Sequence, residues 1–119
     1  MHVTSISEQR RHFRFQLEEP VRIQLQGDST LVSGCLVNLS VGGAFIRCVT
    51  PVEPGRELRC AFMVPHAGSK EVVVCQGAVR WVATPEVLRA SGPGFGVRFT
   101  KVEPKTAAFL EVVARDQQS

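Results

Sequence analysis

Residues 30–49 read TLVSGCLVNLSVGGAFIRCV, two β-type runs joined by a short turn at Ser40–Gly43. If Ser40 and Gly43 flank a tight turn, the runs form an antiparallel hairpin. Its apolar side is then built from opposite pairs: Leu39 with Ala44, Val37 with Ile46, and Cys35 with Cys48. The other side carries Asn38, Ser40 and, turned outward, Phe45. A bulge at the double glycine would shift this register by one residue.

Further strands are predicted on both sides of this hairpin. Residues 21–25 and 58–64 alternate apolar and polar side chains with period two, residues 71–83 form a long β-branched run, and residues 95–99 form a last strand. Pro104 suits the first position of a helix, which we expect to turn Ala108 or Phe109, Val112 and Val113 inward.

Six short strands in so small a chain favour an all-β fold, a closed six-stranded antiparallel β-barrel with a short C-terminal helix. A two-sheet sandwich is the alternative. We expect a loose tail over residues 1–9, the barrel with its N-terminal arginines over 10–103, and the helix and tail over 104–119.

The composition indicates a single globular domain. The chain has 119 residues, is 44% hydrophobic and carries a net charge of only +3, which does not suggest DNA or RNA binding by charge alone. It contains eleven arginines but three lysines. Arginine is suited to bidentate recognition of phosphate and to stacking on rings. A bias in codon usage would explain the ratio equally well.

Several classes of protein are not indicated by the sequence. It has no signal peptide and no apolar run long enough to span a membrane, so we expect a cytoplasmic protein without membrane insertion. The four cysteines lack metal-ligand spacing, and we expect reduced, buried thiols and no metal site: Cys35, Cys48, Cys60 and Cys75. The histidines are scattered and no P-loop occurs, so an enzyme is not expected.

Three arginines, Arg10, Arg11 and Arg14, stand just before the first strand. Such a run is often only a solvated charged segment, and Asn38–Gly43 alone could be only a hairpin turn. Together they describe a site for a compact, anionic ligand that contains a purine. Arginines would bind phosphates or a guanine edge, the Asn38 oxygen would accept from guanine, and Ser40 would bond a phosphate.

These two motifs resemble the signature of the PilZ domain family, R-x-x-x-R followed by [D/N]-x-S-x-x-G. Residues 43–46, 77–82 and 94–99 also look like later strands of that family, so the resemblance covers about residues 8–103. It implies a six-stranded barrel and a bacterial receptor for cyclic di-GMP, with no cofactor. The residues implied to bind the ligand are Arg10, Arg11, Arg14, Asn38, Ser40 and Gly43, with Gly43 leaving room at the barrel surface and Trp81 a weaker candidate for a wall.

The resemblance implies a stand-alone receptor, monomeric or weakly dimeric, that acts through an unidentified protein partner in motility or biofilm control. We expect residues 1–15 to be mobile without ligand and to become ordered around it. Asn38 stands where many members carry aspartate, so an ion pair to the arm is not available and affinity is expected to be lower. The sequence leaves open whether one or two ligands bind.

Two other functions stay open. The first is an adaptor of the same fold that binds a protein partner and no nucleotide. The second is a small-barrel binder of RNA or single-stranded DNA, which needs exposed aromatic side chains near the basic face. Phe62, Phe95, Phe99 and Phe109 are expected to point inward, against this function. Phe13, Phe15 and Phe45 could be exposed near the arginines, in its favour.

Overall fold

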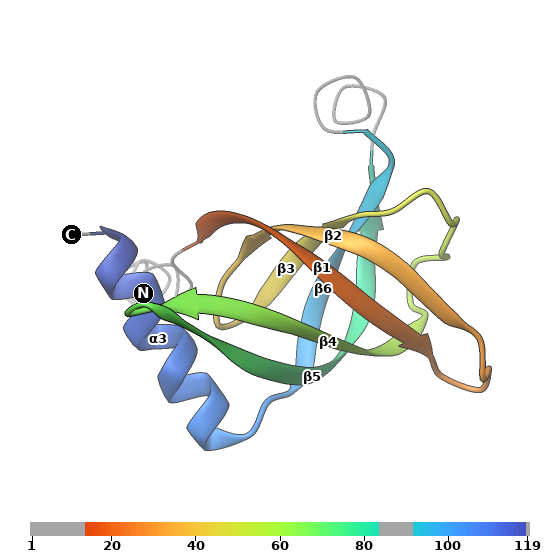
Figure 1. Ribbon diagram of the computed structural model, residues 1–119. Coiled ribbons are helices and arrows are strands. Elements are labelled where there is room, and N and C mark those ends of the chain that lie inside the picture. Colours follow the sequence, from red (N-terminus) through yellow and green to blue (C-terminus); the bar gives the residue numbers. More distant parts are fainter. Residues whose placement is uncertain (1–13, 84–91, 119) are drawn as a thin grey trace, which may run out of the picture.

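The computed structural model describes residues 14–83 and 92–118, and in them six antiparallel strands close into a barrel followed by one helix (Figure 1). The order around the barrel is β1-β2-β3-β6-β5-β4. This confirms the predicted six-stranded antiparallel barrel with a C-terminal helix. The elements are β1 (Phe15–Leu25), β2 (Leu31–Leu39), β3 (Gly43–Arg47), β4 (Glu57–His66), β5 (Ser69–Val82), β6 (Gly94–Lys101) and α3 (Pro104–Gln118).

The core fills the barrel because each strand turns alternate residues inward. In β1, Val21, Ile23 and Leu25 are buried while the residues between them are exposed. Burying one such side chain fully is worth roughly 1.5–3 kcal/mol. Phe15 belongs to the same core and is only 6% exposed. The expectation that the chain is mobile as far as residue 15 is therefore wrong for Phe15, which is fixed by burial at the start of β1.

The β2–β3 hairpin follows the predicted register only beside its turn. Leu39 pairs with Ala44 as predicted, and the backbone N–H of Ser40 donates to the Gly43 carbonyl at 2.9 Å. A bulge at Val37, rather than at the double glycine, then shifts the register. Two predicted pairs are therefore wrong, because Ile46 faces Leu36 instead of Val37, and Cys35 faces Arg47 instead of Cys48.

The helix α3 begins at Pro104 as predicted, but its buried face was predicted only in part. Leu110, Val113 and Ala114 are buried, at the spacing of one helical face. Val113 was expected there and Phe109 is half-buried, whereas Ala108 and Val112 are exposed. The apolar residues cover more than one face of the helix, so their spacing alone did not fix which face packs on the barrel.

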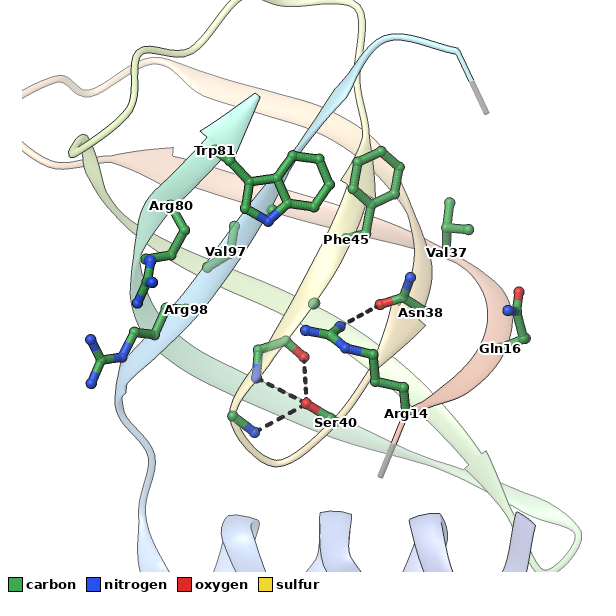
Figure 2. A pocket seen from close by; sticks show the side chains of 14 residues that line it. Arg14, Gln16, Val37, Asn38, Ser40, Phe45, Arg80, Trp81, Val97 and Arg98 are labelled. Carbon is green, nitrogen blue, oxygen red and sulfur yellow. Dashed lines mark hydrogen bonds between the residues drawn. The ribbon is translucent and has the colours of Figure 1, made fainter. Parts of the chain in front are cut away.

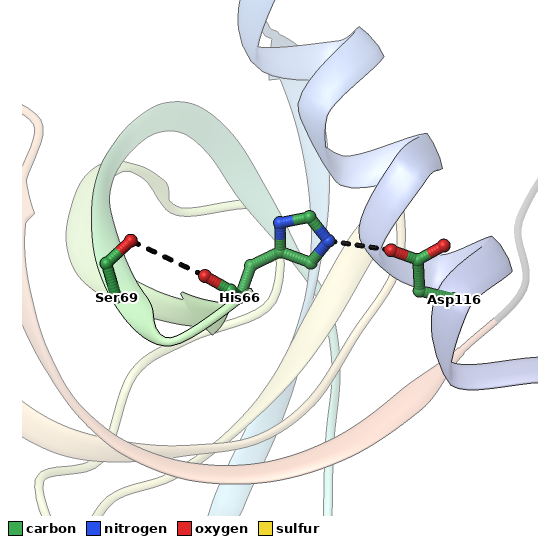
Figure 3. Close-up of polar contacts among 3 residues, drawn as sticks. All are labelled: His66, Ser69 and Asp116. Carbon is green, nitrogen blue, oxygen red and sulfur yellow. Dashed lines mark hydrogen bonds and ion pairs between the residues drawn. The ribbon is translucent and has the colours of Figure 1, made fainter.

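A polar contact also joins α3 to the β4–β5 hairpin. His66 lies 2.7 Å from the carboxylate of Asp116 (Figure 3). Its ring also meets the Phe109 ring edge-on, with centroids 5.8 Å apart. The helix is thus held to the barrel by both an apolar face and a His–Asp pair. Within the described part of the chain, no helix is long and apolar enough to cross a membrane.

All four cysteines are free thiols. Cys48, Cys60 and Cys75 are buried as predicted, whereas Cys35 is only half-buried. Cys60 and Cys75 face each other across β4 and β5. Burial raises the pKa of Cys60 to about 12 and that of Cys75 to about 11, because the barrel interior disfavours the charged thiolate.

Candidate binding pocket on the barrel surface

An aromatic pair forms one wall of the candidate site. Phe45 on β3 and Trp81 on β5 both pair with Gly96 on the strand between them, β6. Gly96 has no side chain, so Trp81 lies directly over it: an added Cβ would be 2.4 Å from the indole nitrogen. Trp81 therefore reaches across Gly96 and stacks on Phe45, with ring centroids 5.4 Å apart and planes at 15° (Figure 2).

This stacking changes the expected exposure of the aromatic residues. Phe45 lies outside the core cluster, as its outward direction predicted, but Trp81 covers it and leaves only 5% of it exposed. Trp81 itself is 44% exposed. Phe45 is thus buried under Trp81, and Phe15 is buried in the barrel core. Both findings are contrary to the interpretation that favoured nucleic-acid binding, and Phe13 lies outside the described residues.

Gly43 lies where β3 meets β6. An added Cβ would be 2.2 Å from the carbonyl oxygen of Val97, closer than real contacts allow. Gly43 does not have a positive φ angle, so conformational freedom is not the reason for glycine here. Its first role is to let the two backbones approach closely. It also lines the pocket, so its predicted role of leaving room for a ligand stays a prediction.

Ser40 lies beside Gly43 in the hairpin turn and is only 1% exposed. Its hydroxyl accepts hydrogen bonds from the backbone N–H groups of Gly42 and Gly43, both at 3.2 Å, and donates to the Gly43 carbonyl at 3.3 Å (Figure 2). The side chain thus holds the turn together. Its predicted bond to a phosphate would have to compete with these contacts.

Arg14 and Asn38 meet at the opposite side of the pocket from Trp81 (Figure 2). The Arg14 guanidinium Nη1 donates to the Asn38 side-chain oxygen Oδ1 at 2.7 Å. Arg14 precedes β1 and Asn38 lies on the outer side of β2, and the two strands pair. The two predicted motifs are therefore brought together through one residue of each. Arg10 and Arg11 lie outside the described residues.

These residues surround an open pocket of about 670 Å³. Two further arginines line it, Arg80 and Arg98, which sequence reasoning did not select. Each stands alone in a strand, where a single arginine resembles any outward-facing charge, and only the barrel brings them to the site. Among the described residues that line the pocket there is no aspartate or glutamate. The pocket therefore combines an aromatic wall with three guanidinium groups.

This arrangement suits an anionic ligand with a flat ring. Guanidinium groups bind phosphate oxygens or a guanine edge, and the indole offers a stacking surface. A volume near 670 Å³ falls within the range of small-molecule sites. In the described ranges, no group of three or more His, Cys, Asp or Glu side chains could hold a metal ion.

Comparison with known proteins identifies relatives of this chain. The PilZ domain family matches residues 8–114. Among curated proteins no match is found. The structure is similar to that of the Bacillus subtilis inhibitor of motility MotI/DgrA, with a TM-score of 0.74 and 16% identity over 91% of this chain. The chain spans only 50% of that protein's length.

Two other solved structures match most of their length. The PilZ domain of YcgR from Escherichia coli, solved with c-di-GMP, has a TM-score of 0.68 and 17% identity, covering 91% of this chain and 90% of that one. The PilZ domain of CeSA from a cellulose-synthesizing bacterium has a TM-score of 0.55 and 15% identity, covering 89% and 98%. At these identities the likeness is one of fold.

Proposed function

The chain belongs to the PilZ domain family, and from this premise we propose that it is a receptor for cyclic di-GMP that binds the ligand in the pocket between Arg14 and Trp81. The observation that carries the proposal is the contact of Arg14 with Asn38 beside an aromatic wall. This contact joins the two signature motifs at a pocket whose described lining residues include no aspartate or glutamate. The ligand's phosphates and guanines match those groups in chemistry.

The signature residues take separate roles in this proposal. Arg14, with Arg10 and Arg11, binds phosphate and guanine groups through charge-assisted hydrogen bonds worth roughly 1.5–3 kcal/mol each. Asn38 orients Arg14 and offers its amide to a guanine edge. Ser40 and Gly43 keep the turn and the β3–β6 contact in shape.

Trp81 is proposed as the stacking wall. Trp81 packs on Phe45 and over Gly96 but is 44% exposed, so part of the indole is accessible to a guanine ring. A rigid aromatic pair loses little conformational entropy when the ligand binds.

Signalling would proceed through the arginine segment. Ligand binding draws Arg10 and Arg11 onto the pocket that Arg14 already lines, and the ligand with this segment forms a surface that a protein partner recognises. The protein is proposed to be cytoplasmic. The proposed output of its signalling is control of motility or biofilm formation. The domain has no catalytic role in this account.

Isothermal titration with cyclic di-GMP tests the proposal. We expect saturable binding by the wild-type chain and none that is measurable by Arg14→Ala at the same concentrations. Arg59→Ala is the matched control, because Arg59 is exposed on β4 and does not line the pocket. No heat with the wild type at high micromolar ligand would favour the nucleotide-free adaptor. Binding of RNA or single-stranded DNA that falls steeply with salt, with no response to cyclic di-GMP, would favour the nucleic-acid binder.

A further inference from the structure

A bulge in β5 places an additional arginine in the pocket. Val79 pairs with Val97 and Trp81 pairs with Gly96, so Arg80 is one extra residue between two consecutive pairs. In a regular strand Arg80 and Trp81 would point to opposite sides of the sheet. The bulge removes this alternation, and Arg80 and Trp81 are both exposed and both line the pocket.

Arg98 lies beside Arg80 on the neighbouring strand β6. It pairs with Gly43 on one side and with Ala78 on the other. Neither neighbour has a side chain that could cover or pair the guanidinium, so Arg98 stays exposed. Figure 2 shows Arg80 and Arg98 together on one side of the pocket, with Arg14 and Asn38 on the other.

Like charges that lie close together on adjacent strands are unfavourable, and an anion bound between or over the two guanidinium groups would offset this. The guanidinium groups of Arg80 and Arg98 make no hydrogen bond or ion pair with any group in residues 14–83 and 92–118. The described lining residues include no carboxylate that could neutralise them. The pair is therefore open to an anionic group of a ligand.

The distance between the two basic sides matches a ligand with more than one anionic group. Asn38 is on β2 and Arg98 is on β6, with β3 between them. Neighbouring strands are about 4.8 Å apart, so the two backbones are separated by roughly 10 Å. Such a separation suits a ligand with two anionic groups, and a cyclic dinucleotide has two phosphodiesters on opposite sides of its ring.

We propose that Arg80 and Arg98 form a second anion site, which binds one phosphodiester of a cyclic dinucleotide while the Arg14 side binds the other. This proposal rests on the proposed function and adds a role to residues outside the two signature motifs. Arg80 is brought to the site by the bulge, and Arg98 by its position on β6, where Gly43 and Ala78 leave it uncovered.

Titration of single variants with cyclic di-GMP tests this assignment. Arg80→Ala and Arg98→Ala are each expected to weaken binding by about 10-fold or more, because each loses charge-assisted bonds to phosphate. Arg59→Ala, the control with the same change of charge, is expected to change affinity by less than about 2-fold. Arg98→Lys should recover part of the loss, since it keeps the charge but not the forked donor geometry.

Phosphorus NMR distinguishes a phosphate contact from a general effect of charge. Free cyclic di-GMP is symmetric and gives one resonance, and in a complex with protein in excess we expect two. Arg98→Ala should move one of them and leave the other near its wild-type position. If both Arg80→Ala and Arg98→Ala match Arg59→Ala in affinity and in spectrum, the second anion site is wrong while the proposed function stands. If the wild type does not bind cyclic di-GMP, both are wrong.

Discussion

The Arg14 guanidinium donates a hydrogen bond of 2.7 Å to the side-chain oxygen of Asn38, which is 24 positions further along the chain. This bond positions the last arginine of the N-terminal motif at the pocket, which both residues line. An asparagine oxygen is a neutral acceptor, and the bond is weaker than the ion pair that an aspartate would form. Arg14 is thus oriented and still available to an anion.

Replacing Asn38 by aspartate tests this relationship. In Asn38→Asp the neutral acceptor becomes a carboxylate and the bond becomes an ion pair, which should fix Arg14 more firmly in its binding position. We expect the affinity for cyclic di-GMP to rise several-fold, as measured by calorimetry, and Asn38→Ala to lower it. An unchanged affinity in both variants would show that this contact does not prepare the site.

Ser40→Ala separates the two roles of this hydroxyl. The change removes the acceptor of two backbone N–H groups in a buried turn, so unfolding free energy should fall by about 1–3 kcal/mol in chemical denaturation. Affinity should fall as the turn loosens. Full stability combined with weakened binding would instead indicate a direct bond to the ligand.

Gly43→Ala should destabilise the barrel, because the new methyl group would meet the Val97 carbonyl oxygen. Crowding of this kind costs about 1–3 kcal/mol or more, which thermal denaturation detects as a lower midpoint. Thr100→Ala, at an exposed position of β6, is the control and should change stability by less than about 0.5 kcal/mol. A midpoint equal to that of the control would contradict the steric role.

Trp81 provides an optical probe because it is the only tryptophan in the chain. If a guanine stacks on the exposed part of the indole, cyclic di-GMP should change the intrinsic fluorescence in a saturable way, with the same midpoint as calorimetry. Trp81→Phe should keep part of the affinity, and Trp81→Ala should lose more of it. Binding measured by calorimetry without any change in fluorescence would place the ligand away from the indole.

Thiol labelling tests the barrel interior. The thiolate is the reactive form, and the pKa values of about 12 for Cys60 and about 11 for Cys75 leave very little of it at pH 8. We expect iodoacetamide to modify half-buried Cys35 first, and Cys60 and Cys75 only in denaturant, as followed by mass spectrometry. Rapid labelling of Cys60 in the native protein would mean that the interior is accessible.

Local sequence pattern predicted the strands well because burial on one side of a sheet requires period-two alternation. It did not predict the exact pairing, since one extra residue at Val37 shifts every pair of the hairpin that lies farther from the turn. The helix could be placed from Pro104, but its buried face could not, because apolar residues lie on more than one side.

The residues of the candidate site could be selected from the sequence only where they belong to a contiguous motif. Arg14 and Asn38 were selected from the sequence, and the structure brings them together. The contact between Phe45 and Trp81 could not be predicted, because it depends on β6 lying between β3 and β5. Arg80 depends in addition on a bulge that leaves no clear trace in the sequence.

The most direct test of the central claim is a titration of the isotope-labelled protein with cyclic di-GMP, followed by backbone and indole NMR resonances. The account predicts that saturable shifts concentrate at Asn38, Gly96 and the Trp81 indole. Residues on the far side of the barrel, such as Arg59 on β4, should stay unchanged. Spectra without shifts at saturating concentrations, or shifts centred on β4, would contradict binding in this pocket.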